Sequence, residues 1–139
     1  MPNYVIEGPR WFRTRIRSQG PFVALIVPAV LGAIALLALN AGRSTTSGLL
    51  GLVLGVFAAP ALLAVGAPFS SASLYPIGVA ISVVLWLCVG YLAARRATRN
   101  PMASWGDYWR NYWWLAVGIW VGATAALVIA RYALGEALV

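Results

Sequence analysis

Long apolar stretches separated by short polar segments form the main pattern of this chain. A helix needs about 20 mostly apolar residues to cross roughly 30 Å of hydrocarbon. Four stretches have that length, at residues 21–41, 48–68, 74–94 and 113–131. Polar and apolar positions do not alternate with a period of two, so strands are not predicted. The pattern predicts an all-α integral membrane bundle of four antiparallel transmembrane helices.

The segments between the apolar stretches are short, and the chain has no internal repeat. We therefore expect a single transmembrane domain over residues 1–139. An Arg-rich interfacial arm, residues 1–20, precedes the first stretch, and an Arg- and Trp-rich segment, residues 95–112, precedes the last. Pro21 is expected to begin the first span, with a corner at Gly20 and Pro21. The first stretch is longer than the apolar core of a signal peptide, so we expect it to be retained.

Composition agrees with a membrane environment. Hydrophobic residues make up 62% of the chain and charged residues 9%, whereas soluble domains are about half apolar and a quarter charged. The expected location is the cell membrane, as a multi-pass protein. All ten basic residues are Arg, and the formal net charge is +7.

The positions of the Arg residues leave the orientation open. With four complete spans each side carries five Arg, so the excess of basic residues expected on the cytoplasmic side is missing. If one middle stretch does not cross, the sides carry eight and two. Pro60 interrupts residues 48–68, which makes this stretch the candidate for a re-entrant or broken helix. Three spans plus such a helix, and two copies inserted in opposite directions, are the alternatives to four spans.

A helix start is predicted just before the last apolar stretch. Ser104 and Asp107 have the spacing of a capping box, and the helix can run from there into the stretch without interruption. On this helix four Trp residues share one face, and two Gly residues lie on the roughly opposite face. We expect the Trp face to meet lipid headgroups or a partner and the Gly face to pack on a neighbouring helix.

Arg side chains beside apolar stretches are expected to contact anionic lipid headgroups or partner subunits. The candidate contact residues are Arg10, Arg13, Arg17, Arg95, Arg96, Arg99, Arg110, Trp105, Trp109 and Trp113. A sharper hypothesis is a specific anionic lipid pocket between the Arg and Trp side chains of residues 95–112. Nucleic acid is not an expected partner, because the bilayer offers these Arg residues a nearer anion.

Two pairs of Gly residues have the GxxxG spacing that allows close helix crossings. They are Gly51 with Gly55 and Gly118 with Gly122. The sequence leaves open whether such crossings join helices of one chain or of different chains.

Catalytic chemistry has few candidates. The chain has no His, and none of the four apolar cores holds an ionisable acidic or basic side chain, which would mark a proton path or reaction centre. Cys88 lies in an apolar helix, a setting that does not favour a thiolate. We expect no cofactor, no metal site and no enzyme activity. The predicted function is a small accessory or assembly subunit of a larger membrane complex. The alternative is a homo-oligomeric channel or transporter with a polar site near Pro60, Ser82 and Thr124.

Overall fold

A computed structural model describes residues 9–41, 44–64 and 71–137. The described residues form helices and no strand, which confirms the all-α prediction. The elements are α1 (Pro9–Val23), α2 (Ile26–Ala41), α3 (Thr45–Ala58), α4 (Ala61–Ala64), the short 3-10 helix η1 (Ala72–Leu74), α5 (Tyr75–Ala97) and α6 (Trp105–Ala137).

Three helical stretches are long and apolar enough to cross a membrane. They are Arg10–Ala41, which joins α1 and α2, Tyr75–Ala97 and Trp105–Ala133. The chain therefore has the helices of a multi-pass membrane protein. The stretch predicted at residues 48–68 differs, because α3 has only 14 residues and ends at Ala58. Residues 65–68 of that prediction, like Arg43, lie outside the described residues.

Proline explains where two helices are interrupted. Pro60 has no N–H to donate to the carbonyl one turn earlier, and α3 ends just before it. The helix thus breaks at Pro60, as in the alternative to four complete spans. Pro21 was expected to begin the first span, and this is wrong, because Pro21 lies inside α1. The interruption follows at Ala24 and Leu25, four and three residues before Pro28.

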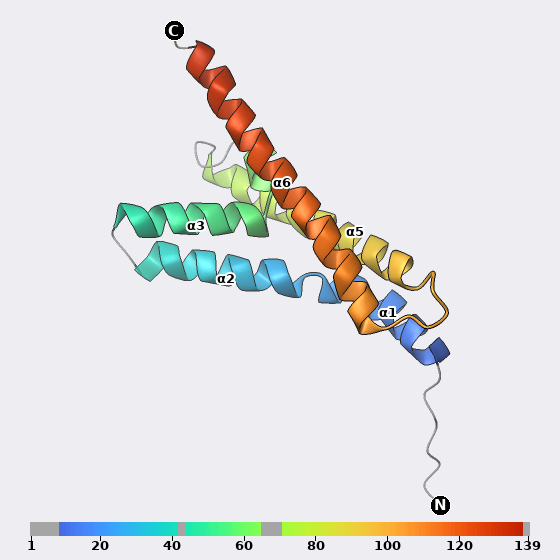
Figure 1. Cartoon of the computed structure of the whole chain (residues 1–139). Helices are drawn as coiled ribbons and strands as arrows, with labels where there is room; N and C mark the ends of the chain where they lie inside the picture. The colour runs from blue at the N-terminus through green and yellow to red at the C-terminus, as the bar shows by residue number, and fades with distance from the viewer. Residues whose placement is uncertain (1–8, 42–43, 65–70, 138–139) are drawn as a thin grey trace, which may run out of the picture.

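The helices divide into a closed end and an open arm (Figure 1). The closed end comprises α1, α5 from Trp86 onward and α6 up to Trp120, which pack on one another. The open arm comprises the α2–α3 hairpin and the part of α6 after Trp120. In Figure 1 the hairpin and the last turns of α6 diverge from each other.

Small and aromatic side chains fill the core of the closed end. Its buried members are Ile16, Ala24, Trp86, Val89, Ala93, Ala94, Ala97, Ala103, Tyr108, Tyr112 and Ala116. The many Ala residues allow α1 to lie close against α5.

Two glycines mark the closest approach between α1 and α5. A Cβ atom added at Gly90 would lie 2.5 Å from the Ala24 Cβ and 2.8 Å from the Pro21 Cα. A Cβ atom added at Gly20 would lie 2.8 Å from the Ala94 Cβ. Since later residues of α1 meet earlier residues of α5, the two helices run antiparallel. The beginning of α1 therefore lies beside the end of α5 (Figure 1).

Candidate functional site

Two Arg side chains of α1 contact Thr98, which lies in the second Arg-rich segment. Arg13 Nη2 donates a hydrogen bond to the Thr98 carbonyl at 3.1 Å, and Arg17 Nε donates to Thr98 Oγ1 at 3.1 Å. Thr98 itself is fully buried and its hydroxyl donates to the Ala94 carbonyl at 2.8 Å. The two Arg-rich segments, which are far apart in the sequence, thus form one cationic end. We use this name for Arg10, Arg13, Arg17, Arg95, Arg96 and Arg99.

The positive charges of the cationic end have no described acidic partner. Among the described side chains the one ion pair joins Arg110 and Asp107, with 3.1 Å between Nη2 and Oδ1. Arg10, Arg17, Arg95, Arg96 and Arg99 are exposed, and Arg13 is half-buried. Exposed guanidinium groups of this kind can bind phosphate or carboxylate groups.

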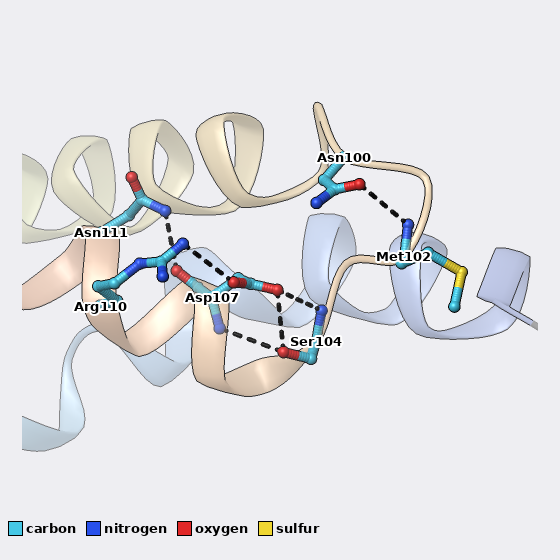
Figure 2. Close-up of polar contacts among 6 residues, drawn as sticks. All are labelled: Asn100, Met102, Ser104, Asp107, Arg110 and Asn111. Atoms are coloured by element: carbon cyan, nitrogen blue, oxygen red, sulfur yellow. Dashed lines mark hydrogen bonds and ion pairs between the residues drawn. The ribbon is translucent and has the colours of Figure 1, made fainter.

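The predicted capping box at the start of α6 is confirmed (Figure 2). The Asp107 N–H donates to Ser104 Oγ at 3.3 Å, and the Ser104 N–H donates to Asp107 Oδ2 at 3.2 Å. From there α6 continues without interruption to Ala137, as predicted. Asp107 also holds Arg110, which removes Arg110 from the set of unpaired cations.

At the interruption between α1 and α2, a tyrosine of α6 donates a hydrogen bond that replaces a missing helical one. Pro28 lacks the N–H that would otherwise bond to the Ala24 carbonyl. Tyr112 instead donates its hydroxyl to that carbonyl at 3.0 Å. One turn earlier, Tyr108 donates to the Gly20 carbonyl at 2.6 Å. Both tyrosines are fully buried, so these bonds satisfy polar groups that water does not reach.

At the interruption after α3, two tryptophans donate hydrogen bonds to backbone carbonyls in the same way. Trp86 Nε1 of α5 donates to the Ala58 carbonyl at 2.8 Å, and Trp120 Nε1 of α6 donates to the Phe57 carbonyl at 3.1 Å. These carbonyls lie in the last turn of α3, where helical partners are missing. The indole N–H groups thus tie the end of α3 to the middle of α5 and α6.

The chain reverses its direction after this point. The Ala58 carbonyl meets Trp86, whereas the Ala61 N–H, three residues later, donates to Ser82 Oγ at 3.1 Å. Ser82 lies closer to the beginning of α5 than Trp86 does. The segment from α3 to α4 therefore enters between the helices and turns back toward the start of α5.

The Trp and Gly faces of α6 are packed to different extents within this chain. Trp105, Trp109 and Trp120 pack against the buried core cluster of the closed end, and Trp113 is 44% exposed. No described atom lies within 4 Å of a Cβ added at Gly118 or Gly122. Within this chain the Trp face is therefore the packed one, and the Gly face is open. Contact of either face with lipid or another subunit stays a prediction.

The two residues of the first GxxxG pair have different surroundings. A Cβ added at Gly51 would lie 2.5 Å from Leu39 Cγ, so α2 and α3 cross closely there. Gly55 has no described atom within 4 Å of such a Cβ.

A hollow of about 530 Å³ lies beside the open part of α6. Phe57 of α3 forms one wall, and Trp120, Val121, Thr124 and Val128 are among the α6 residues that line it. The polar groups of the predicted channel site do not converge on it. Thr124 donates its hydroxyl to the carbonyl of Trp120 in its own helix, and Ser82 Oγ bonds both Ala61 and Gly78.

The residues that hold the closed end together are not among those predicted from the sequence. Tyr108 and Tyr112 lie four residues apart on α6, and Gly20 with Ala24 and Gly90 with Ala94 have the small-xxx-small spacing. Allowing Ala as well as Gly in that pattern would have found the α1–α5 crossing. Pro28 would have pointed to Ala24 as a carbonyl in need of another donor.

Comparisons of the chain with family models, with curated proteins and with solved structures found no match. Within the described residues, no three His, Cys, Asp or Glu side chains gather as a metal site would require. Cys88, the single cysteine, is exposed on α5.

Proposed function

We propose that this chain is a non-catalytic accessory subunit that docks onto a larger membrane complex through its open arm. In this proposal three helices cross the membrane, and α3 with α4 forms a re-entrant segment. The cationic end lies at the cytoplasmic surface. The main support for this topology is the contact of Arg13 and Arg17 with Thr98. The main support for the docking role is the open Gly face of α6.

The Arg contacts favour three spans over four. Four complete spans would separate residues 1–20 from residues 95–112 by the whole bilayer. Arg13 and Arg17 instead hydrogen-bond to Thr98. With both segments on one side, that side carries eight Arg residues and the other carries two. Such an asymmetry is typical of a cytoplasmic side.

Helix lengths support the same arrangement. About 20 residues, or roughly 30 Å, separate the level of Gly20, Ala94 and Tyr108 from the opposite ends of the three long helices. Those opposite ends lie near Ala41, Tyr75 and Arg131. Each of the three helices thus has a stretch about as long as the membrane is thick, with polar or charged residues near both ends of that stretch.

The α3 helix is too short to cross. Its 14 residues extend about 21 Å, less than the hydrocarbon thickness of roughly 30 Å. Its last carbonyls meet Trp86 and Trp120, near the middle of the long helices. Non-helical backbone at that depth is tolerated where protein covers it, and the two indole donors provide that cover.

The open part of α6 supports docking on another membrane helix. No residue of 121–133 is buried by the rest of the described chain. Gly122 lies in this part and Gly118 one turn before it, and both are exposed, so a second helix can come close to the backbone there. Lipid can cover such a face, but close helix contact uses small residues in particular.

Affinity purification from native membranes in mild detergent tests the docking role. We expect the wild-type chain to be recovered with other membrane subunits in fixed stoichiometry, and Gly118→Leu with Gly122→Leu to lose them. Gly135→Leu is the matched control, since Gly135 is also open and lies on the same helix. Recovery as a homo-oligomer that conducts ions in liposomes would support the channel alternative and contradict the accessory role.

A further inference from the structure

We propose that Arg13 and Arg17, held by Thr98, form a specific binding site for the phosphate group of one anionic phospholipid. The inference rests on the proposed topology, which brings the cationic end to the headgroup level of the cytoplasmic leaflet. It differs from the lipid pocket expected from the sequence, because it joins α1 to the end of α5.

The two guanidinium groups are held in place by a buried anchor. Thr98 is fully buried and caps α5, and its two oxygens accept the bonds from Arg13 and Arg17 at 3.1 Å each. Each guanidinium has five N–H donors, so most of its donors are left for a ligand. Side chains that are already ordered lose less conformational entropy when they bind.

Two cations near one residue repel each other unless an anion joins them. Within the described chain the acidic side chain near this end, Asp107, already binds Arg110. A phosphate diester supplies the missing negative charge, and its oxygens match the paired N–H groups of Arg.

The surroundings favour a lipid as the source of that phosphate. Trp11 and Phe12 flank the Arg residues on α1 and are 36% and 37% exposed. Their rings contact each other edge to face, with 5.0 Å between the centroids. Exposed aromatic rings beside Arg are typical of helices at the headgroup boundary, where the rings enter the acyl region and the charges meet phosphates.

Native mass spectrometry of the full chain tests the site. The protein is purified in detergent and given equal amounts of phosphatidylglycerol and phosphatidylcholine with identical acyl chains. We expect the wild-type chain to retain one phosphatidylglycerol in preference. Arg13→Gln with Arg17→Gln should lower this retention about thirtyfold, as expected for two Arg contacts of about 1 kcal/mol each with an anionic headgroup.

A matched variant separates a defined site from general attraction. Arg15→Gln with Arg131→Gln removes the same charge elsewhere, because Arg15 bonds Gln19 and stacks on Trp11, and Arg131 is exposed far along α6. We expect this variant to retain phosphatidylglycerol like the wild type. Equal loss in both double variants would overturn the proposal.

Substitutions at Thr98 provide a second test, which leaves both Arg charges in place. Thr98→Val removes the hydroxyl that anchors Arg17, whereas Thr98→Ser keeps it. We expect Thr98→Val to lower phosphatidylglycerol retention and Thr98→Ser to leave it unchanged, each at an unchanged unfolding temperature. Full retention by Thr98→Val would contradict the anchored site, and so would displacement of the lipid by millimolar inorganic phosphate. Either result leaves the topology standing if residues 18 and 100 are on the same side of the membrane.

Discussion

The closed end and the open arm of this protein consist of the same kind of apolar helix, but their backbones are supported differently. At the closed end, α1 lies against α5 at Gly20 and Gly90, and buried tyrosines bond to its carbonyls. In the open arm, α2 packs mainly on α3, and the last turns of α6 are exposed. The difference predicts that the closed end contributes more to the free energy of unfolding than the open arm does.

Few side-chain hydrogen bonds connect the closed end to the hairpin of the open arm. Trp86 and Trp120 connect the end of α3 to α5 and α6, and Ser82 bonds the turn after it. Because these bonds lie between the closed end and the hairpin, they fix the position of the segment from α3 to α4. Changes in the closed end should therefore destabilise the whole chain, whereas changes at the junction should release α3 alone.

The largest expected effect is at the α1–α5 crossing. Gly90→Leu would push a side chain into Ala24 and Pro21, and we expect a loss of about 3 kcal/mol in the free energy of unfolding. Thermal or denaturant unfolding in detergent measures it. Gly122→Leu is the matched control, since Gly122 lies in the open arm and its surroundings are open, and it should leave the stability of the isolated chain unchanged. Similar losses in both variants would remove the distinction between the two regions.

The tyrosine bond to Ala24 predicts a smaller loss that depends on Pro28. Tyr112→Phe leaves the Ala24 carbonyl without a donor and should cost about 1–2 kcal/mol. Pro28→Ala restores a backbone N–H one turn ahead, so Tyr112→Phe should cost less in that background. A double-mutant cycle of unfolding free energies measures this coupling. Additive effects would show that Pro28 is not the reason for the bond. Tyr132→Phe, at a position that is 71% exposed, is the control.

The smallest effect is expected at the junction with the open arm. Trp120→Phe removes the donor to the Phe57 carbonyl, worth about 1 kcal/mol, and should act locally, because Trp120 is only half-buried and lies at the edge of the closed end. Hydrogen–deuterium exchange should rise in peptides from α3 and α4 and stay unchanged in α1. Trp114→Phe is the control, because Trp114 is 75% exposed. A uniform rise in exchange would mean that the two regions unfold together.

The sequence predicts the elements of this fold better than their partners. Apolar length identifies the long helices, Pro60 locates the end of α3, and Ser104 with Asp107 locates the start of α6. The packed faces were not predictable in the same way, because a membrane helix is apolar toward lipid and toward protein alike. The Trp face of α6 illustrates this, since aromatic residues suit both a lipid boundary and a protein core.

The contact between the two Arg-rich segments was also not predictable from the sequence. Counting Arg residues gave a tie for four spans, whereas the packing of α1 on α5 and the contacts of Arg13 and Arg17 with Thr98 bring the segments together. Such a contact links residues more than 80 positions apart, which no local pattern encodes. The same contact defines both the favoured topology and the candidate lipid site.

Cysteine labelling in intact cells tests this topology most directly. In a Cys88→Ala background, single cysteines replace Ser18, Ser44, Asn100 and Tyr132, all of which are exposed. With a membrane-impermeant maleimide, three spans predict that residues 18 and 100 are protected together and that residues 44 and 132 are labelled together. Pairing of residue 18 with residue 132, and of residue 44 with residue 100, would show four complete spans and contradict the account.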